Sequence, residues 1–429
     1  MHDPEPVIPG ISEPDRQAFQ RRTLSVLFAS SVFGRGAMTT VFVVAALLVE
    51  EILGSGTWAG LSVVAITVGT AFSSSYLAKM MLQRGRRPAL VIGYSIAVAG
   101  SLIALLSGQM ALSRNSAALL PVLLIGMVLF GVGQGASNLS RYAASDLAHP
   151  DKRSQAIGLV VFASTAGAVG GPALAGLAGK VAQRVDFYPL VGPFMFSLAF
   201  FSIAGFILWT SLRPDPLVLS GGVDKDKTVA RPSFRDGVGY IRQSRMAMLA
   251  VVGLVISQAV MVMVMTMTPR HMTGHEHDLG WVGHVISAHT AGMFAFAPLA
   301  GWVADKVGKM KTLMISAVVL MIATGITAAA TNAELWMMLL GLYLLGLGWS
   351  FGVVAGSSLL TESVEPTHRV PAQGAADVIA SLTSGIGALA SGVVVTYAGF
   401  DLLSVAGVVG AAILLAVTLH RYWLSPVRV

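Results

Sequence analysis

Twelve apolar runs, each long enough to cross a lipid bilayer, are the feature that most constrains what this chain can fold into. A helix needs about 20 apolar residues to span the hydrocarbon core. The runs cover roughly residues 23–49, 58–82, 89–109, 118–140, 155–179, 188–212, 247–268, 280–303, 312–331, 335–359, 371–397 and 401–420. They do not alternate apolar and polar residues, as the strands of a membrane barrel would. The sequence therefore predicts an all-α membrane protein with twelve transmembrane helices.

Composition and polar stretches support this division. The 429 residues are 55% hydrophobic and 11% charged, a balance that no soluble globular domain of this size could keep in solution. The longest polar stretch separates the runs six and six. We predict a tail, an N-terminal half, a central linker, a C-terminal half and a second tail over residues 1–22, 23–212, 213–246, 247–420 and 421–429.

An internal repeat relates the two halves. Residues 216 positions apart match in one ungapped register: Asp146 with Glu362, Pro150 with Pro366, Arg153 with Arg369, Gly158 with Gly374, Gly171 with Gly387 and Gly176 with Gly392. Such matches indicate a duplicated six-helix unit. We therefore expect two pseudo-symmetric halves.

Basic residues are distributed unevenly between the loops. Most of the 28 Lys and Arg residues fall in or beside the tails, the linker and the loops on the same side of the membrane. The positive-inside rule then places both termini in the cytoplasm. The net charge of +7 reports this orientation, so nucleic acid is not an expected partner. The absence of cysteine excludes disulfides and thiolate ligands.

Short motifs in the loops indicate a conformational lock. The stretch GWVADKVGK, with Gly301, Asp305 and Gly308, resembles the signature GxxxD(R/K)xG(R/K) of the major facilitator superfamily. The corresponding first-half loop keeps Gly85 and Arg86 but has Leu82 in place of the acidic residue. The candidate gating residues are Gly85, Arg86, Arg141, Asp146, Arg153, Gly301, Asp305, Gly308 and Arg369, and we expect the charged ones to form ion pairs that hold one conformation.

The resemblance to the major facilitator superfamily covers about residues 20–420 and includes GAVGGPALAG in the fifth run, which is similar to the motif of its antiporter branch. It implies a secondary transporter that works by alternating access, in the lipid bilayer and as a monomer. No nucleotide-binding P-loop or accessible catalytic triad occurs, so we do not expect an enzyme. A non-transporting sensor on the same scaffold is a further alternative.

Two helix-spaced pairs of soft ligands occur in the seventh and eighth runs. Met261 and Met265 are four residues apart, as are His289 and Met293, so each pair shares one helix face. Thioether and imidazole together suit copper above other metals. The alternative is that the methionines fill the core and that His289 is satisfied by a backbone carbonyl.

The same four residues match, one for one, the pattern of the CcoA-like copper importers, a branch of this superfamily. The resemblance implies copper uptake for haem–copper oxidase assembly across a bacterial inner membrane. Copper, free or chelated, would be the cargo rather than a cofactor, and a copper chaperone would be a partner. An outer loop could capture the metal through His271, Met272, His275 and His277, although a solvated turn explains that loop equally well.

Four polar residues inside the runs are candidates for substrate binding or coupling: Arg35, Gln134, Asn138 and Asp377. Ionisable residues at membrane depth are costly and commonly functional. Arg35 repels a bare cation and attracts an anion, unless neighbouring carbonyls satisfy it. It therefore favours a chelated or anionic substrate, and the alternative function is a proton-coupled exporter of drugs or small organic anions.

Overall fold

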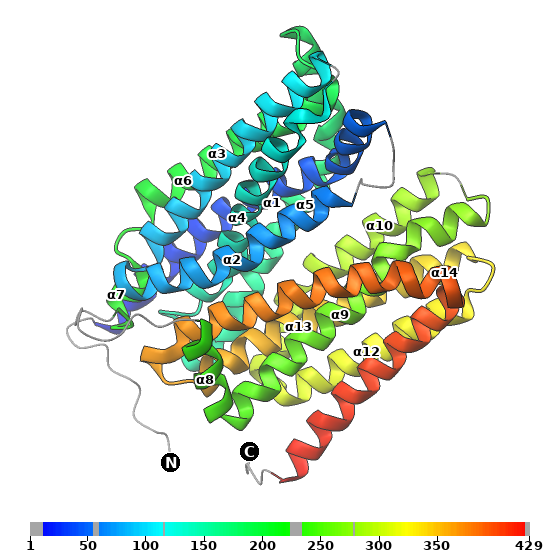
Figure 1. Cartoon of the computed structure of the whole chain (residues 1–429). Coiled ribbons are helices and arrows are strands. Elements are labelled where there is room, and N and C mark those ends of the chain that lie inside the picture. The colour runs from blue at the N-terminus through cyan, green and yellow to red at the C-terminus, as the bar shows by residue number, and fades with distance from the viewer. Residues whose placement is uncertain (1–11, 55–59, 115, 224–233, 278, 425–429) are drawn as a thin grey trace.

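The computed structural model describes residues 12–54, 60–114, 116–223, 234–277 and 279–424, and nearly all of them are helical. The helices form two bundles that meet near the end where the chain begins and finishes and diverge toward the other end (Figure 1). We call the face that carries both ends of the described chain the terminal face, and the other the opposite face.

The N-terminal bundle contains six long helices, which correspond to the first six apolar runs. They are α1 (Glu13–Leu53), α2 (Leu61–Arg84), α3 (Arg86–Ser113), α4 (Leu120–Ala143), α5 (Arg153–Arg184) and α6 (Gly192–Ser211). α1 begins well before the apolar run, because Ser12 caps it by accepting a hydrogen bond from the Asp15 N–H and Pro14 suits its first turn. α1 therefore extends into the predicted tail, of which residues 1–11 lie outside the described residues.

The C-terminal bundle also contains six helices in the described residues, but they do not correspond one to one with its six crossings. They are α9 (Arg245–Gly274), α10 (Leu279–Phe294), α11 (Ala297–Val307), α12 (Lys309–Ala329), α13 (Leu335–Ser363) and α14 (Arg369–Leu424). α10 and α11 are two parts of the eighth crossing. α14 makes two crossings, because Gly399 takes a positive φ of 83° and reverses the chain.

Ten helices in the described residues are long and apolar enough to cross a membrane. One of them, α14, crosses twice, and the α10–α11 pair adds another crossing. The twelve predicted crossings are therefore confirmed. The linker contains two short helices that were not predicted, α7 (Pro216–Leu219) and α8 (Phe234–Gln243), while residues 224–233 and 425–429 lie outside the described residues.

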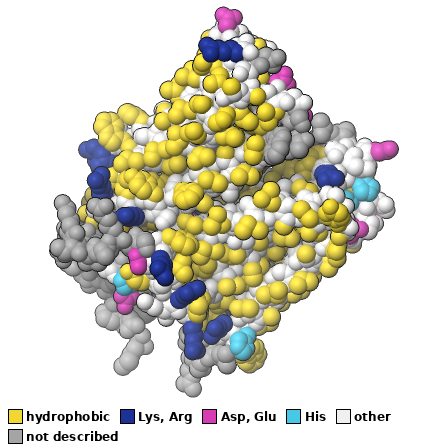
Figure 2. Space-filling model, in the orientation of Figure 1, with side chains coloured by type: hydrophobic (Ala, Val, Ile, Leu, Met, Phe, Trp, Pro, Cys, Tyr) yellow, Lys and Arg dark blue, Asp and Glu magenta, His cyan; other side chains and the backbone are white. Residues whose placement is uncertain are grey.

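Each bundle buries its own apolar core and presents a second apolar surface outward. Figure 2 shows hydrophobic side chains over the flanks of both bundles, and most Lys and Arg side chains in that view lie toward the terminal face. Large side chains such as Phe72 and Tyr397 are exposed by 77% and 86%. Such exposure suits contact with lipid tails rather than with water.

The two bundles contact each other most closely near the terminal face. There the first turns of α5 pack against α11, and the end of α2 packs against the start of α14. A Cβ atom on Gly301 would lie 2.6 Å from the Ser154 carbonyl oxygen, so this backbone approach requires glycine. The structure is therefore closed at the terminal face and open toward the opposite face.

Candidate functional site

A central cavity of about 320 Å³ lies between the bundles. Its lining includes all four residues that the sequence suggested for substrate binding or coupling: Arg35, Gln134, Asn138 and Asp377. They come from α1, α4 and α14, so residues of both halves contribute. The volume falls at the lower end of the range typical of small-molecule sites.

A chain of hydrogen bonds runs along the N-terminal wall of the cavity. Arg35 Nη1 donates to Gln134 Oε1 at 3.1 Å, and Gln134 Nε2 donates to Asn138 Oδ1 at 2.8 Å. The guanidinium carbon of Arg35 also lies 5.3 Å from the centroid of the Phe294 ring. None of the ion pairs in the described part of the chain includes Arg35. Its positive charge therefore faces the cavity without a carboxylate to neutralise it.

The intramembrane carboxylate pairs with a different arginine. Arg141 of α4 and Asp377 of α14 form a buried ion pair across the two halves, with Nη2 and Oδ1 2.5 Å apart. Arg141 also donates to the Ser357 hydroxyl at 3.1 Å and to the Tyr142 hydroxyl at 3.1 Å. Asp377 Oδ2 is buried and has no hydrogen-bond partner among the described residues. This pair lines the cavity and ties the halves together.

The C-terminal wall contains two polar residues that the sequence analysis missed. Trp349 Nε1 of α13 donates to Gln258 Oε1 of α9 at 2.6 Å, and both residues line the cavity. The Trp349 ring also contacts Phe294 edge to face, at 5.6 Å between centroids. A glutamine within the apolar run GLVISQAVMV was the signal that could have found Gln258.

The four predicted copper ligands do not all reach the cavity. Met261 and Met293 line it, but Met265 and His289 do not. His289 is fully buried, with Nδ1 2.8 Å from the Leu342 carbonyl oxygen of α13. The two residues outside the lining lie one helical turn, or about 6 Å, farther from the terminal face than the two inside it. In this structure the four donors therefore do not converge on the cavity, because His289 on α10 bonds to a neighbouring helix.

The histidines near the opposite face bond to backbone instead of converging. His271 Nε2 lies 3.0 Å from the Ala330 carbonyl oxygen, and His277 Nε2 lies 2.8 Å from that of Ala333. His275 Nδ1 lies 2.8 Å from the His271 oxygen, and Met272 is fully buried. Within the described ranges, no three His, Asp or Glu side chains are placed to share a metal ion. His271 and His277 thus attach the end of α9 to the loop between α12 and α13.

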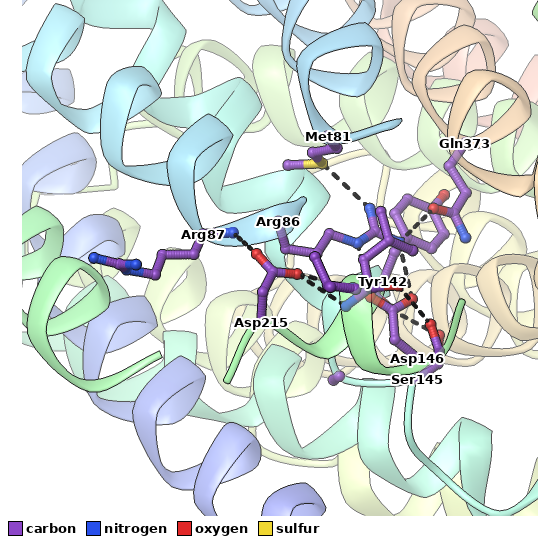
Figure 3. A network of polar contacts seen from close by, with 12 residues as sticks. Met81, Arg86, Arg87, Tyr142, Ser145, Asp146, Asp215 and Gln373 are labelled. Carbon is purple, nitrogen blue, oxygen red and sulfur yellow. Dashed lines mark hydrogen bonds and ion pairs between the residues drawn. The ribbon is translucent and has the colours of Figure 1, made fainter. Parts of the chain in front are cut away.

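The first-half loop forms a buried lock at the terminal face (Figure 3). Arg86 makes two bonds to the Asp146 carboxylate, at 2.8 and 3.0 Å, and a third to Gln373 Oε1 of α14 at 3.0 Å. Gly85 takes a φ of 94°, and a Cβ there would lie 2.5 Å from an Asp215 carboxylate oxygen. Arg86 thus reaches the other half through an amide, although Leu82 replaces the motif's acidic residue.

The second-half loop locks the same face through Asp305. Its carboxylate accepts hydrogen bonds from the backbone N–H groups of Ser154 and Gln155, at 3.2 and 2.9 Å, and so caps α5 of the other half. Lys309 lies 3.1 Å from Glu362 and 3.8 Å from Asp305. Gly308 makes the turn with a φ of 100°. The two loops therefore hold the terminal face closed from both sides.

Arg153 and Arg369 do not form the predicted ion pairs in the described part of the chain. Arg369 Nε donates to the Val364 carbonyl oxygen at 3.1 Å, and Arg153 Nε has no hydrogen-bond partner within the part of the chain that is described. The two residues are repeat mates and lie close enough for their charges to repel. The pseudo-symmetry explains why these two arginines do not form the predicted ion pairs. They occupy equivalent positions in the two halves, close to the pseudo-two-fold axis, so the two positive charges lie near each other.

Two six-helix bundles around a cavity that opens to one face define the class: a polytopic membrane transporter. The chain belongs to the Major Facilitator Superfamily, whose sequence profile matches residues 26–282 and 271–428. It is 33% identical to the uncharacterized MFS-type transporter YddS of Bacillus subtilis, over 96% of this chain and 94% of that protein. It is 27% identical to the riboflavin transporter RfnT of Brucella anthropi, over 84% and 85%.

Solved structures show the same fold. The crystal structure of the human organic anion transporter MFSD10 superimposes with a TM-score of 0.75, over 93% of this chain and 99% of that one, at 16% identity. The proton:xylose symporter XylE gives 0.72 over 96% and 97%, at 14% identity. These likenesses concern the fold alone.

Proposed function

We propose that this transporter carries a small organic anion through the membrane by alternating access. One observation carries the proposal: Arg35 lines the central cavity and has no carboxylate partner among the described residues. An uncompensated guanidinium in a low-dielectric cavity attracts an anion and repels a bare cation. Asp377 does not offset this charge, because it is already paired with Arg141.

One sequence relative is named for an organic substrate, because RfnT is named a riboflavin transporter. The cavity of about 320 Å³ has room for a molecule of one or two rings. Its apolar side chains, among them Phe294 and Trp349, would contact the body of such a substrate.

We place the terminal face in the cytoplasm of a bacterial inner membrane, with both tails inside. The uneven distribution of Lys and Arg supports this orientation. The structure is then outward-facing, with the two loop locks closed on the cytoplasmic side. We propose that the protein works as a monomer, and that it is a carrier and not an enzyme. We also propose that transport is coupled to protons through Asp377.

Copper uptake is the second candidate function. Met261 and Met293 both line the cavity, and their thioethers suit copper(I). Met265 and His289 lie outside the lining, so this site would offer two protein ligands instead of four. A role in haem–copper oxidase assembly, with a copper chaperone as partner, follows only if copper is the substrate.

The first prediction tests the proposal by ligand-dependent stability. The purified protein in detergent is heated with the one- and two-ring organic anions benzoate and 2-naphthoate, with the organic cation benzylammonium and with copper(I). We expect at least one anion to raise the midpoint of unfolding, because a ligand that binds only the folded state stabilises it. Arg35→Gln should abolish this shift, whereas Arg270→Gln, at an exposed position, should keep it.

The opposite pattern would overturn the proposal. Anions that stabilise Arg35→Gln as well as the wild type would show that Arg35 is not the anion site. Stabilisation by copper(I) alone, lost in Met261→Leu, would replace the organic anion with the metal.

A further inference from the structure

Obligate donors determine how the amide side chains of the cavity are oriented. An arginine side chain can only donate, so the atom of Gln134 that it contacts must be the carbonyl oxygen. The Gln134 amide nitrogen then has to donate to the next residue, and the Asn138 oxygen accepts. The remaining polar group of Asn138 is its –NH₂ group. The chain of hydrogen bonds that begins at Arg35 therefore ends in a donor, the –NH₂ group of Asn138.

The same reasoning applies to the opposite wall. The indole N–H of Trp349 can only donate, so the atom of Gln258 that lies 2.6 Å away is the carbonyl oxygen. The –NH₂ group of Gln258 is left to donate elsewhere. Gln258 is partly exposed and lines the cavity. A second donor thus comes from the C-terminal half.

The lining consequently offers more donors than acceptors. It contains three side-chain amides within the described ranges, and the oxygens of all three already accept hydrogen bonds from protein. Serine and threonine hydroxyls can act in either sense and do not change the balance. Oδ1 of the Asp377 carboxylate is held by Arg141, and Oδ2 is buried, so neither oxygen is open to a ligand. A ligand in this cavity would therefore have to supply acceptors.

We infer that the cavity selects organic anions whose body carries further hydrogen-bond acceptors, such as ring nitrogens or carbonyl oxygens, between Asn138 and Gln258. This inference deepens the proposed function and rests on it. The acid group of the ligand lies at Arg35, and the acceptors on its ring meet the two amides. A site built to donate rejects analogues that lack the acceptor, because its polar groups are then left unpaired.

Trp349 acts as a positioning residue for this selection. Its indole N–H holds the Gln258 oxygen, so the amide cannot turn and present an acceptor to the ligand. Phenylalanine at position 349 would keep an aromatic ring beside Phe294 but would release the amide. Selectivity should therefore weaken in Trp349→Phe even though Trp349 itself need not bond to the ligand.

The second prediction compares three acids of similar size by calorimetric or fluorescence titration: pyrazine-2-carboxylate with ring acceptors, benzoate with none and 3-aminobenzoate with a donor. We expect the wild type to bind pyrazine-2-carboxylate about ten-fold more tightly than benzoate, which corresponds to about 1.4 kcal/mol for one good hydrogen bond. Gln258→Glu should lose that preference, and Trp349→Phe should raise the relative affinity for 3-aminobenzoate. Gln17→Glu, at the terminal face, is the matched control.

The outcomes separate the two proposals. Equal binding of the three acids, abolished by Arg35→Gln, would overturn this inference and leave the organic-anion function standing. Binding that Arg35→Gln does not affect, or no binding of any acid at millimolar concentration, would count against both.

Discussion

Two arginines at membrane depth differ in how their charge is compensated. Arg141 has a carboxylate and two hydroxyls around its guanidinium, whereas Arg35 has an amide and an aromatic ring. Burying a charge is costly unless it is paired. Arg141 therefore stabilises the closed arrangement of the halves, while Arg35 keeps a charge that a ligand can neutralise.

The third prediction concerns the ion pair between the halves. Asp377→Asn leaves Arg141 buried without a counter-charge, a change that costs about 3–5 kcal/mol in typical buried pairs. We expect the terminal face to open more often. Because the chain has no cysteine, a single Ser154→Cys probe, buried at that face, reports the opening through its rate of maleimide labelling.

Labelling in Asp377→Asn should be at least several-fold faster than in the parent. Asp401→Asn, which makes the same chemical change away from the cavity, is the control and should leave the rate unchanged. Equal rates in all three proteins would show that the ion pair does not hold the halves together.

Individual elements show how the lock tolerates a missing acidic residue. The first-half loop has Leu82 where its counterpart has Asp305, yet Arg86 still reaches α14 through Gln373. Asp146 holds the same guanidinium from within the half, so Arg86 is fixed before it meets α14. The contact that Arg86 makes with the other half then depends on one neutral hydrogen-bond acceptor, Gln373 Oε1.

The fourth prediction concerns two substitutions of Gln373, one that strengthens its hydrogen bond to Arg86 and one that removes it. Gln373→Glu replaces the amide with a carboxylate and should strengthen the bond to Arg86, because hydrogen bonds between charged groups are roughly twice as strong as neutral ones. Gln373→Leu removes the bond. With the Ser154→Cys probe, we expect slower labelling in the first variant and faster labelling in the second. Changes in the same direction in both variants would contradict a role for this bond in closure.

At the scale of the whole molecule, the apolar runs were sufficient to predict the number of crossings and the two halves. They could not predict which side of each helix faces the cavity. In a soluble helix the polar face marks the exterior, but in these runs the lipid-facing and core-facing residues are both apolar. Met261 and Met265 share a face, and only the structure shows that the cavity reaches the first and not the second.

The sequence also could not predict which polar side chains pair between helices that are distant along the chain. Arg35 and Asp377 stood out as the intramembrane charges, and their partners depend on how α1, α4 and α14 are arranged. Gln258 was overlooked because a single amide in an apolar run has no spacing pattern. His289 lies outside the cavity lining, with Nδ1 bonded to a backbone carbonyl on α13 and Nε2 buried without a hydrogen-bond partner among the described residues, and no spacing pattern in the sequence indicates this arrangement.

The fifth prediction tests movement of the halves as rigid units. Ser154 and Ser358 belong to opposite halves, and their hydroxyl oxygens lie 2.7 Å apart. Cysteines at both positions should form a disulfide on oxidation. Uptake of a stabilising anion into proteoliposomes should then fall to background and recover on reduction, because the closed face can no longer open.

A cross-link within one half provides the comparison. Ser257 and Ser316 are 3.4 Å apart in the C-terminal half, and cysteines there should leave most of the uptake intact after oxidation. Full uptake with the first pair oxidised would mean that the substrate does not pass by separation of these two surfaces.

The interruption between α10 and α11 divides the eighth crossing into two segments that contact different halves. α11 packs against α5 of the other half where Gly301 meets Ser154, whereas α10 bonds to α13 of its own half through His289 and carries Phe294 to the side of Arg35. One crossing thus takes part both in the contact that closes the terminal face and in the wall of the cavity. The break between the segments allows each to keep the direction that its own neighbours require.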